Sequence, residues 1–169
     1  MTKATVWLAL LGYAAGASAL LLARGREEPA ARGRLRKFAR GAWTFGCAWF
    51  LAHVASAFNF QHGWSHAHAY AETARQTGEV VGVSFGAGVF VSYVFTLLWA
   101  ADTLWWWLAP DSHERRPRFL DVVWHALFFF IVFNGTVVFE RGPARWLGLL
   151  ITAALVAAWW AGRERVRLR

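Results

Sequence analysis

The sequence predicts an all-α fold: an integral membrane bundle of about five transmembrane helices, with the N-terminus outside and the C-terminus in the cytoplasm. Composition is the first reason, because 57% of the 169 residues are hydrophobic and only 17% are charged, which is more apolar than ordinary soluble domains. The second is that apolar runs of roughly 18 residues or more recur along the chain, each long enough to cross a hydrocarbon core about 30 Å thick. We therefore expect residues 1–169 to form a single transmembrane helical domain.

Five apolar runs supply the expected spans, which cover residues 5–23, 41–60, 80–108, 119–139 and 146–162. The first run also resembles a signal peptide, because Lys3 precedes it and Ala17, Ser18 and Ala19 resemble a cleavage site. The run continues to Ala23, however, and cleavage would leave a strongly basic segment on the outside. We therefore expect a retained first helix.

Glycines mark the places where spans are expected to bend or to approach each other. The third run is longer than one span needs, and we expect any kink in it at Gly82, Gly86 or Gly88. The pairs Gly12/Gly16 and Gly82/Gly86 have the four-residue spacing that lets two helix backbones approach closely. This spacing does not identify the partner helix.

Lys and Arg residues are concentrated in alternate connections between the expected spans. They gather in residues 24–40, in the connection before residue 119 and in the C-terminal tail, whereas the opposite side receives only Lys3, Arg75, Arg141 and Arg145. Because short loops rich in Lys and Arg stay in the cytoplasm, this asymmetry sets the predicted orientation. We interpret the formal net charge of +8 as the topology signal of a multi-pass protein in a bacterial cytoplasmic (inner) membrane. The lipid bilayer is then the expected partner, and nucleic acid is not.

Tryptophan is abundant, with 12 residues in the chain. Indole rings favour the membrane–water boundary, where one edge is apolar and the N–H is hydrated. We therefore expect an aromatic belt. Trp64 and Trp146 are expected near the outer boundary, and the residues expected near the cytoplasmic one are Trp43, Trp105, Trp106, Trp107, Trp124, Trp159 and Trp160.

The expected outer loop between the second and third spans is rich in histidine. His62, His66 and His68 lie close to Glu72, and His53 lies one to two turns deeper. Imidazole is a common ligand of transition metals, so the cluster suggests a metal site, for Zn or Cu. On a helix His62 and His66 share a face, as do His68 and Glu72, so a complete site needs His53, another span or a second subunit. The alternative is a solvated loop whose histidines cap helix ends and form hydrogen bonds at the interface.

Three ionisable residues fall inside the expected spans, on their cytoplasmic half. Asp102 lies in the third span, and Asp121 and His125 lie one turn apart in the fourth. A charge in hydrocarbon costs a few kcal/mol or more, so these groups are expected to face the bundle interior and to pair with one another. They would form either a proton relay or a static link between helices.

A polar layer is expected near the middle of the membrane, where His53, Ser92, Tyr93 and Asn134 reach similar depths. Hydrogen bonds between helices are the usual role of such residues. A haem held by two histidines would need His53 and His125 at matching depth. They are expected to lie about six residues apart along the bilayer normal, roughly 9 Å at 1.5 Å per residue, which disfavours that arrangement.

Familiar catalytic motifs are absent from the sequence. It contains no nucleotide-binding glycine loop, no HExxH, no GxSxG and no repeated pair of histidine boxes, and Cys47 is its only cysteine. The first hypothesis is therefore a non-enzymatic structural or interaction subunit of a membrane assembly, which binds other membrane-protein subunits or itself. The alternatives are a metal- or haem-binding redox or transport protein that uses the outer histidines, and a proton-coupled carrier that uses Asp102, Asp121 and His125.

Overall fold

The computed structural model describes residues 2–138, 145–146, 148–150 and 152–153. Within these residues the protein is all-helical, as expected. The elements with assigned bounds are the helices α1 (Thr2–Arg24), α2 (Pro29–Ala57), α3 (His66–Val81), α4 (Gly88–Leu108), α5 (Pro110–Glu114) and α6 (Arg118–Phe133), together with the π-helical turns η1 (Phe58–His62) and η2 (Asn134–Val138). The turns η1 and η2 continue α2 and α6 without a break.

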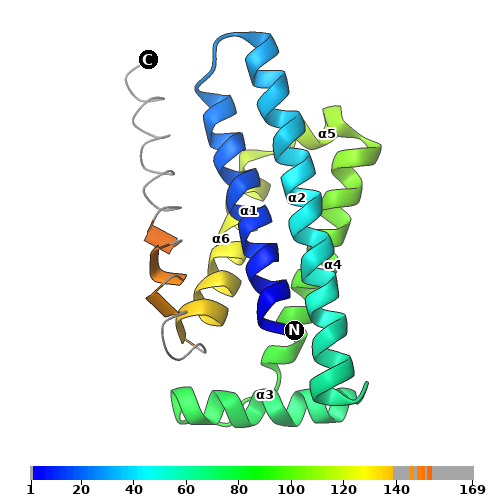
Figure 1. Ribbon diagram of the computed structural model, residues 1–169, viewed down its shortest axis with the longest axis vertical. Coiled ribbons are helices and arrows are strands. Elements are labelled where there is room, and N and C mark those ends of the chain that lie inside the picture. Colours follow the sequence, from blue (N-terminus) through cyan, green and yellow to red (C-terminus); the bar gives the residue numbers. More distant parts are fainter. Residues whose placement is uncertain (1, 139–144, 147, 151, 154–169) are drawn as a thin grey trace.

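Four helices run side by side, and two shorter ones lie at the ends of the bundle (Figure 1). The bundle consists of α1, α2, α4 and α6, in which α1 and α2 are antiparallel neighbours with the most extensive mutual packing. Helix α3 lies across one end, and α5 lies at the other end, near the turn between α1 and α2.

Three helical stretches are long and apolar enough to cross a membrane: Ala4–Arg24, Gly88–Leu108 and Phe119–Val138. Their length and composition are those of membrane-spanning helices and indicate a membrane protein. The expected span at 41–60 lies within α2 and η1, but Trp, Gly and His residues make it less apolar, and it is not one of the three. Most of the expected fifth span, residues 146–162, lies outside the described residues.

The expected third span at 80–108 is divided between two helices. Gly82 has a left-handed backbone (φ 81°), and its N–H donates a hydrogen bond to the Gly78 carbonyl at 3.0 Å, which ends α3. Helix α4 then begins at Gly88. Gly82 therefore caps a helix and does not mediate a helix contact. An apolar run predicts that its residues avoid water, but it does not predict that they form one continuous helix.

The connection between α3 and α4 packs tightly on α3 at Gly86. A Cβ added to Gly86 would lie 2.7 Å from the Tyr70 carbonyl oxygen, which is too close for any other residue. The short connection thus holds α3 against the start of α4.

The partner of the Gly12/Gly16 pair is α2. A Cβ added to Gly12 would lie 2.6 Å from the Cα of Gly46 and 2.8 Å from the Ala42 carbonyl oxygen, and one on Gly16 would lie 3.2 Å from the Ala39 carbonyl oxygen. Glycine at these positions allows the backbones of α1 and α2 to approach closely, as small residues do in membrane bundles.

An aromatic cluster joins all four long helices. The ring of Phe128 on α6 lies 4.5 Å from that of Tyr13 on α1, 4.9 Å from Trp43 on α2, and 4.7 Å from both Phe95 and Trp99 on α4, measured between ring centroids. Rings at these separations attract beyond the apolar area that they bury.

Two tryptophans expected in an interfacial belt lie in the protein interior. Trp43 is 2% exposed and Trp106 is 4% exposed. Trp107 is exposed, and it packs under the guanidinium of Arg40 at 4.0 Å while its indole N–H donates to the Thr44 hydroxyl at 2.9 Å. Sequence depth alone did not separate these two environments, because Trp106 and Trp107 are adjacent and point in different directions.

The glycine contact predicts a difference between two Gly→Ala variants. Gly12→Ala places a methyl group against the Gly46 backbone, which cannot rotate away, and should lower the free energy of unfolding by about 1–3 kcal/mol. Gly41→Ala on α2 meets nothing within 4 Å, so it should leave stability unchanged or raise it slightly. Thermal unfolding of both variants in one detergent, followed by circular dichroism, measures the difference. Equal melting temperatures would contradict the assigned α1–α2 contact.

Candidate functional site

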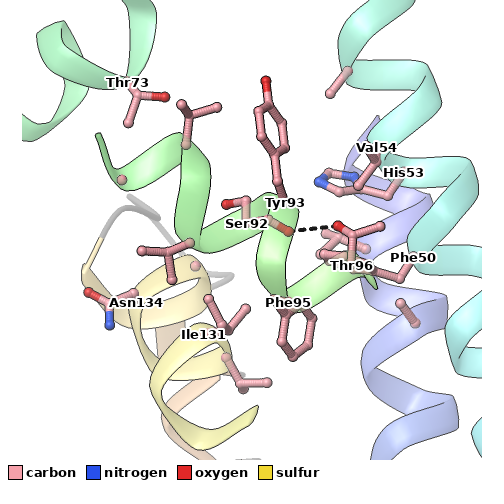
Figure 2. Close-up of a pocket in the computed structure, with 18 of the residues that line it drawn as sticks. Phe50, His53, Val54, Thr73, Ser92, Tyr93, Phe95, Thr96, Ile131 and Asn134 are labelled. Atoms are coloured by element: carbon pink, nitrogen blue, oxygen red, sulfur yellow. Dashed lines mark hydrogen bonds between the residues drawn. The ribbon is translucent and has the colours of Figure 1, made fainter. Parts of the chain in front are cut away.

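A cavity of about 610 Å³ lies between the long helices at the α3 end of the bundle. Its deeper wall is apolar and includes Phe50, Phe95, Trp99, Phe128 and Ile131, and its α3 side is polar. Figure 2 shows side chains from α2, α3, α4, α6 and η2 around this space. The glycine contact of α1 with α2 and the aromatic cluster hold the helices that form the walls.

The residues of the expected polar layer all line this cavity: His53, Ser92, Tyr93 and Asn134. The hydrogen bonds that the structure gives them are not made within the layer. The Tyr93 hydroxyl lies 3.0 Å from His66 Nδ1, and the Asn134 amide donates to the Phe130 carbonyl of its own helix at 2.8 Å. The layer therefore supplies polar groups to a cavity wall.

His53 contacts the N-terminal helix. Its Nδ1 lies 3.3 Å from the Thr5 hydroxyl, and its ring lies 6.0 Å from that of Phe50. His125 lines a separate, smaller cavity at the opposite end of the bundle. The two histidines therefore line different cavities.

The candidate metal ligands do not converge on one point. The rings of His62 and His68 lie 5.7 Å apart, whereas His66 turns toward Tyr93. Among the residues that the structure describes, no group of three or more His, Cys, Asp or Glu side chains is placed to hold a metal ion. Ser65 explains the separation, because its hydroxyl accepts the His68 N–H at 3.2 Å and caps α3. His66 and His68 are two residues apart, so they project from nearly opposite sides of α3, while His62 belongs to η1.

Glu72 is held by neighbours on its own helix. The Arg75 guanidinium donates to both carboxylate oxygens, at 2.5 and 2.9 Å, and the Gln76 amide donates at 2.8 Å. The Arg75 hydrogen bonds, followed by the Gln76 hydrogen bond, lower the pKa of Glu72 to about 2. The carboxylate is therefore ionised at neutral pH, but its oxygens are already engaged, which disfavours it as a metal ligand.

His62 lines the polar side of the cavity and contains a buried ring nitrogen. Its Nδ1 is buried and has no hydrogen-bond partner among the described residues. The ring lies edge-on to Phe58 at 5.6 Å and is near enough to Glu72 to help lower the pKa of that carboxyl. A buried polar atom without a partner costs about 1–3 kcal/mol, so a ligand that bonds this nitrogen would recover that free energy.

The opposite end of the bundle contains a buried ionic network around Arg116. Its guanidinium lies 2.7 Å from an Asp102 oxygen and 2.5 Å from an Asp121 oxygen. Asp102 also contacts His113 Nε2 at 3.1 Å, and Asp121 contacts Arg24 at 3.1 Å. The side chains of Asp102 and His113 are 5% exposed and that of Arg116 is 8% exposed. The network connects α1, α4 and α6 with α5, which contains His113, and with the short connection after α5, which contains Arg116.

The expected arrangement of Asp102, Asp121 and His125 is not formed. Arg116 bridges the two carboxylates, and His125 Nδ1 instead lies 3.0 Å from the backbone carbonyl of Asp121, one turn earlier. The physical reason is charge: a guanidinium carries a permanent positive charge and several donors, so it satisfies two carboxylates better than one imidazole does.

Sequence reasoning missed the roles of His113 and Arg116, because it placed both in the cytoplasmic connection before residue 119 and used that connection only as a topology signal. The His113 ring is stacked on Trp106, with centroids 4.6 Å apart and planes 9° apart. Pro110 begins the short helix α5, which turns the connection back over the bundle. The signal available in the sequence was the pair of acids, Asp102 and Asp121, within apolar segments. Such acids need a cation nearby, and the short connection between the two segments contains arginines.

The ionic network predicts the order of stability of two Asp102 variants. Asp102→Asn keeps a hydrogen-bond acceptor for Arg116 and should lower the free energy of unfolding by about 1–3 kcal/mol. Asp102→Leu leaves His113 and part of the Arg116 charge without a buried partner and should lower it by about 3–5 kcal/mol. Melting curves of the solubilised protein measure the order. Parent-like stability of both variants would mean that Asp102 has no buried partner.

Comparison with known proteins finds no matching family model, no similar curated protein and no similar solved structure. The two ends of the bundle differ in their chemistry. One end is closed by paired charges, and the other contains a large cavity with an apolar wall and a polar side.

Proposed function

We propose that this chain is a multi-pass membrane protein that binds a neutral amphiphilic small molecule in the cavity beside α3. The cavity is the observation that carries the proposal. Its volume of about 610 Å³ falls within the range of small-molecule sites, roughly 300–1,000 Å³, and such sites are mostly apolar with a few placed polar groups.

The charges around the cavity support a neutral ligand. Among the lining residues that the structure describes, Glu72 is the one carboxylate, no Lys or Arg is present, and Arg75 already pairs with Glu72. A charged ligand would lose its hydration without gaining an opposite charge, which is unfavourable. An amphiphile dissolved in the bilayer fits both the apolar wall and the polar side.

The alternatives from the sequence receive less support from the geometry. Gly12 and Gly16, which suggested association with other subunits, pack against α2 and do not present a free face. Arg116 holds both acids of the suggested proton carrier. The candidate metal ligands are spread over α2, η1 and α3, and the described part of the chain contains no assembled site for a metal- or haem-binding role.

For the topology we propose five spans in a bacterial inner membrane. Helix α2 packs antiparallel to α1 along its length, so it crosses with α1 as a fourth span, and residues 146–162 form the fifth. The turn after Arg24 and the α5 segment, with their clustered arginines, then lie in the cytoplasm, and α3 lies outside.

The topology predicts the activity of reporters fused after Arg169. A fluorescent protein that folds only in the cytoplasm should be active there, and an alkaline phosphatase that needs the periplasm should be inactive, because the arginine-rich connections stay inside. The matched control is a phosphatase inserted after Gly78, at the end of α3, which should be active. The reverse pattern would overturn the orientation.

The binding proposal predicts opposite results for two neighbouring residues of α4. Thr96 lines the cavity and Leu97 is 70% exposed on the outer surface. The probe is ω-bromododecanol, whose bromine quenches tryptophan fluorescence, titrated into protein in lipid nanodiscs. Thr96→Phe fills part of the cavity and should weaken saturable quenching at least about tenfold, whereas Leu97→Phe should leave it unchanged.

The quenching experiment has two outcomes that contradict the proposal. One is the absence of a saturable component in the parent protein. The other is equal quenching of the Thr96→Phe and Leu97→Phe variants, which would place the probe at the lipid-facing surface.

A further inference from the structure

We infer that the cavity selects amphiphiles with a hydroxyl head group, and that His62 is the residue that determines this specificity. The inference rests on the proposed function, because it names the ligand class of the same cavity. It starts from His62, whose side chain lines the cavity and whose buried Nδ1 lacks a hydrogen-bond partner among the described residues.

The backbone around His62 is fixed in an unusual conformation. Residues Phe58–His62 form the π-turn η1, and π-turns within helices occur often at functional sites. Gly63 (φ 54°) and Trp64 (φ 59°) follow in the left-handed region, which is rare for a residue other than glycine. Such strain persists only where surrounding contacts determine it.

Three hydrogen bonds hold this turn. The Trp64 N–H donates to the Phe58 carbonyl at 3.0 Å, the Ser65 N–H donates to the His62 carbonyl at 2.9 Å, and the Trp64 indole donates to the Asn59 side chain at 3.2 Å. His62 is thus positioned by its own backbone.

The groups beside His62 define the head group. Gln61, Glu72 and Gln76 line the same polar side of the cavity. The ionised Glu72 repels an acidic head group, and its pairing with Arg75 removes most of the attraction for a cation. A hydroxyl both donates and accepts, so it bonds Nδ1 in either tautomer of the imidazole.

The tail of the ligand would lie along the apolar wall. Phe50, Phe95 and Phe128 line the cavity away from α3 and contact one another through their rings. A linear alcohol therefore matches the cavity from end to end, with its carbon chain among the phenylalanines and its oxygen at His62.

The test compares two probes that differ only in the hydroxyl group: ω-bromododecanol and bromododecane, each measured by saturable tryptophan quenching in nanodiscs. The parent protein should bind the alcohol about three- to tenfold more tightly, which is the size of one net hydrogen bond. His62→Ala should abolish this preference without changing bromododecane binding, and His62→Gln, which retains hydrogen-bonding groups, should restore part of it.

His68→Ala is the matched control, because the His68 ring neighbours His62 but does not line the cavity. It should keep the full preference for the alcohol. Equal affinity of the parent protein for both probes, or an unchanged preference in His62→Ala, would overturn the inference while leaving the cavity as a binding site. Absence of saturable quenching by either probe would overturn the proposed function itself.

Discussion

The arrangement of the helices depends on the ion pairs that the Arg116 guanidinium forms. The guanidinium neutralises the buried carboxylate of Asp102 on α4 and the partly buried one of Asp121 on α6, and Asp121 extends the network to Arg24 at the end of α1. Burying Asp102 without a cation would cost several kcal/mol. Helices that differ widely in sequence position are therefore held at one end by charge, in a geometry that a purely apolar contact would not specify.

This restraint allows the other end of the bundle to remain less densely packed. Between the two ends, the rings around Phe128 join α1, α2, α4 and α6, and the glycine contact brings α1 and α2 together. Beyond the rings the helices line the cavity, and α3 lies across that end. The ligand that we propose would occupy this space, with its tail along the rings and its polar group toward α3.

Much of the fold was predictable from local patterns, and much of the site was not. The helical class, the apolar stretches of α1, α4 and α6, and the close approach at Gly12 all follow from residue type and spacing. The division of residues 80–108 did not follow, because only the left-handed conformation of Gly82 ends α3 there. Similarly, His53, Ser92, Tyr93 and Asn134 were recognised as a layer, but the cavity that they line depends on how four helices are spaced.

By itself the sequence determined that this is a helical membrane protein and which polar residues lie in or near its apolar segments, because hydrophobicity and helix periodicity are local properties. Only the tertiary structure decided which of these groups meet. Arg116 and His113 reach the buried acids because α5 turns the chain back, and His66 leaves His62 because Ser65 begins a new helix. Pairing between charges and the convergence of ligands depend on distances between segments remote in sequence, and no local pattern encodes those distances.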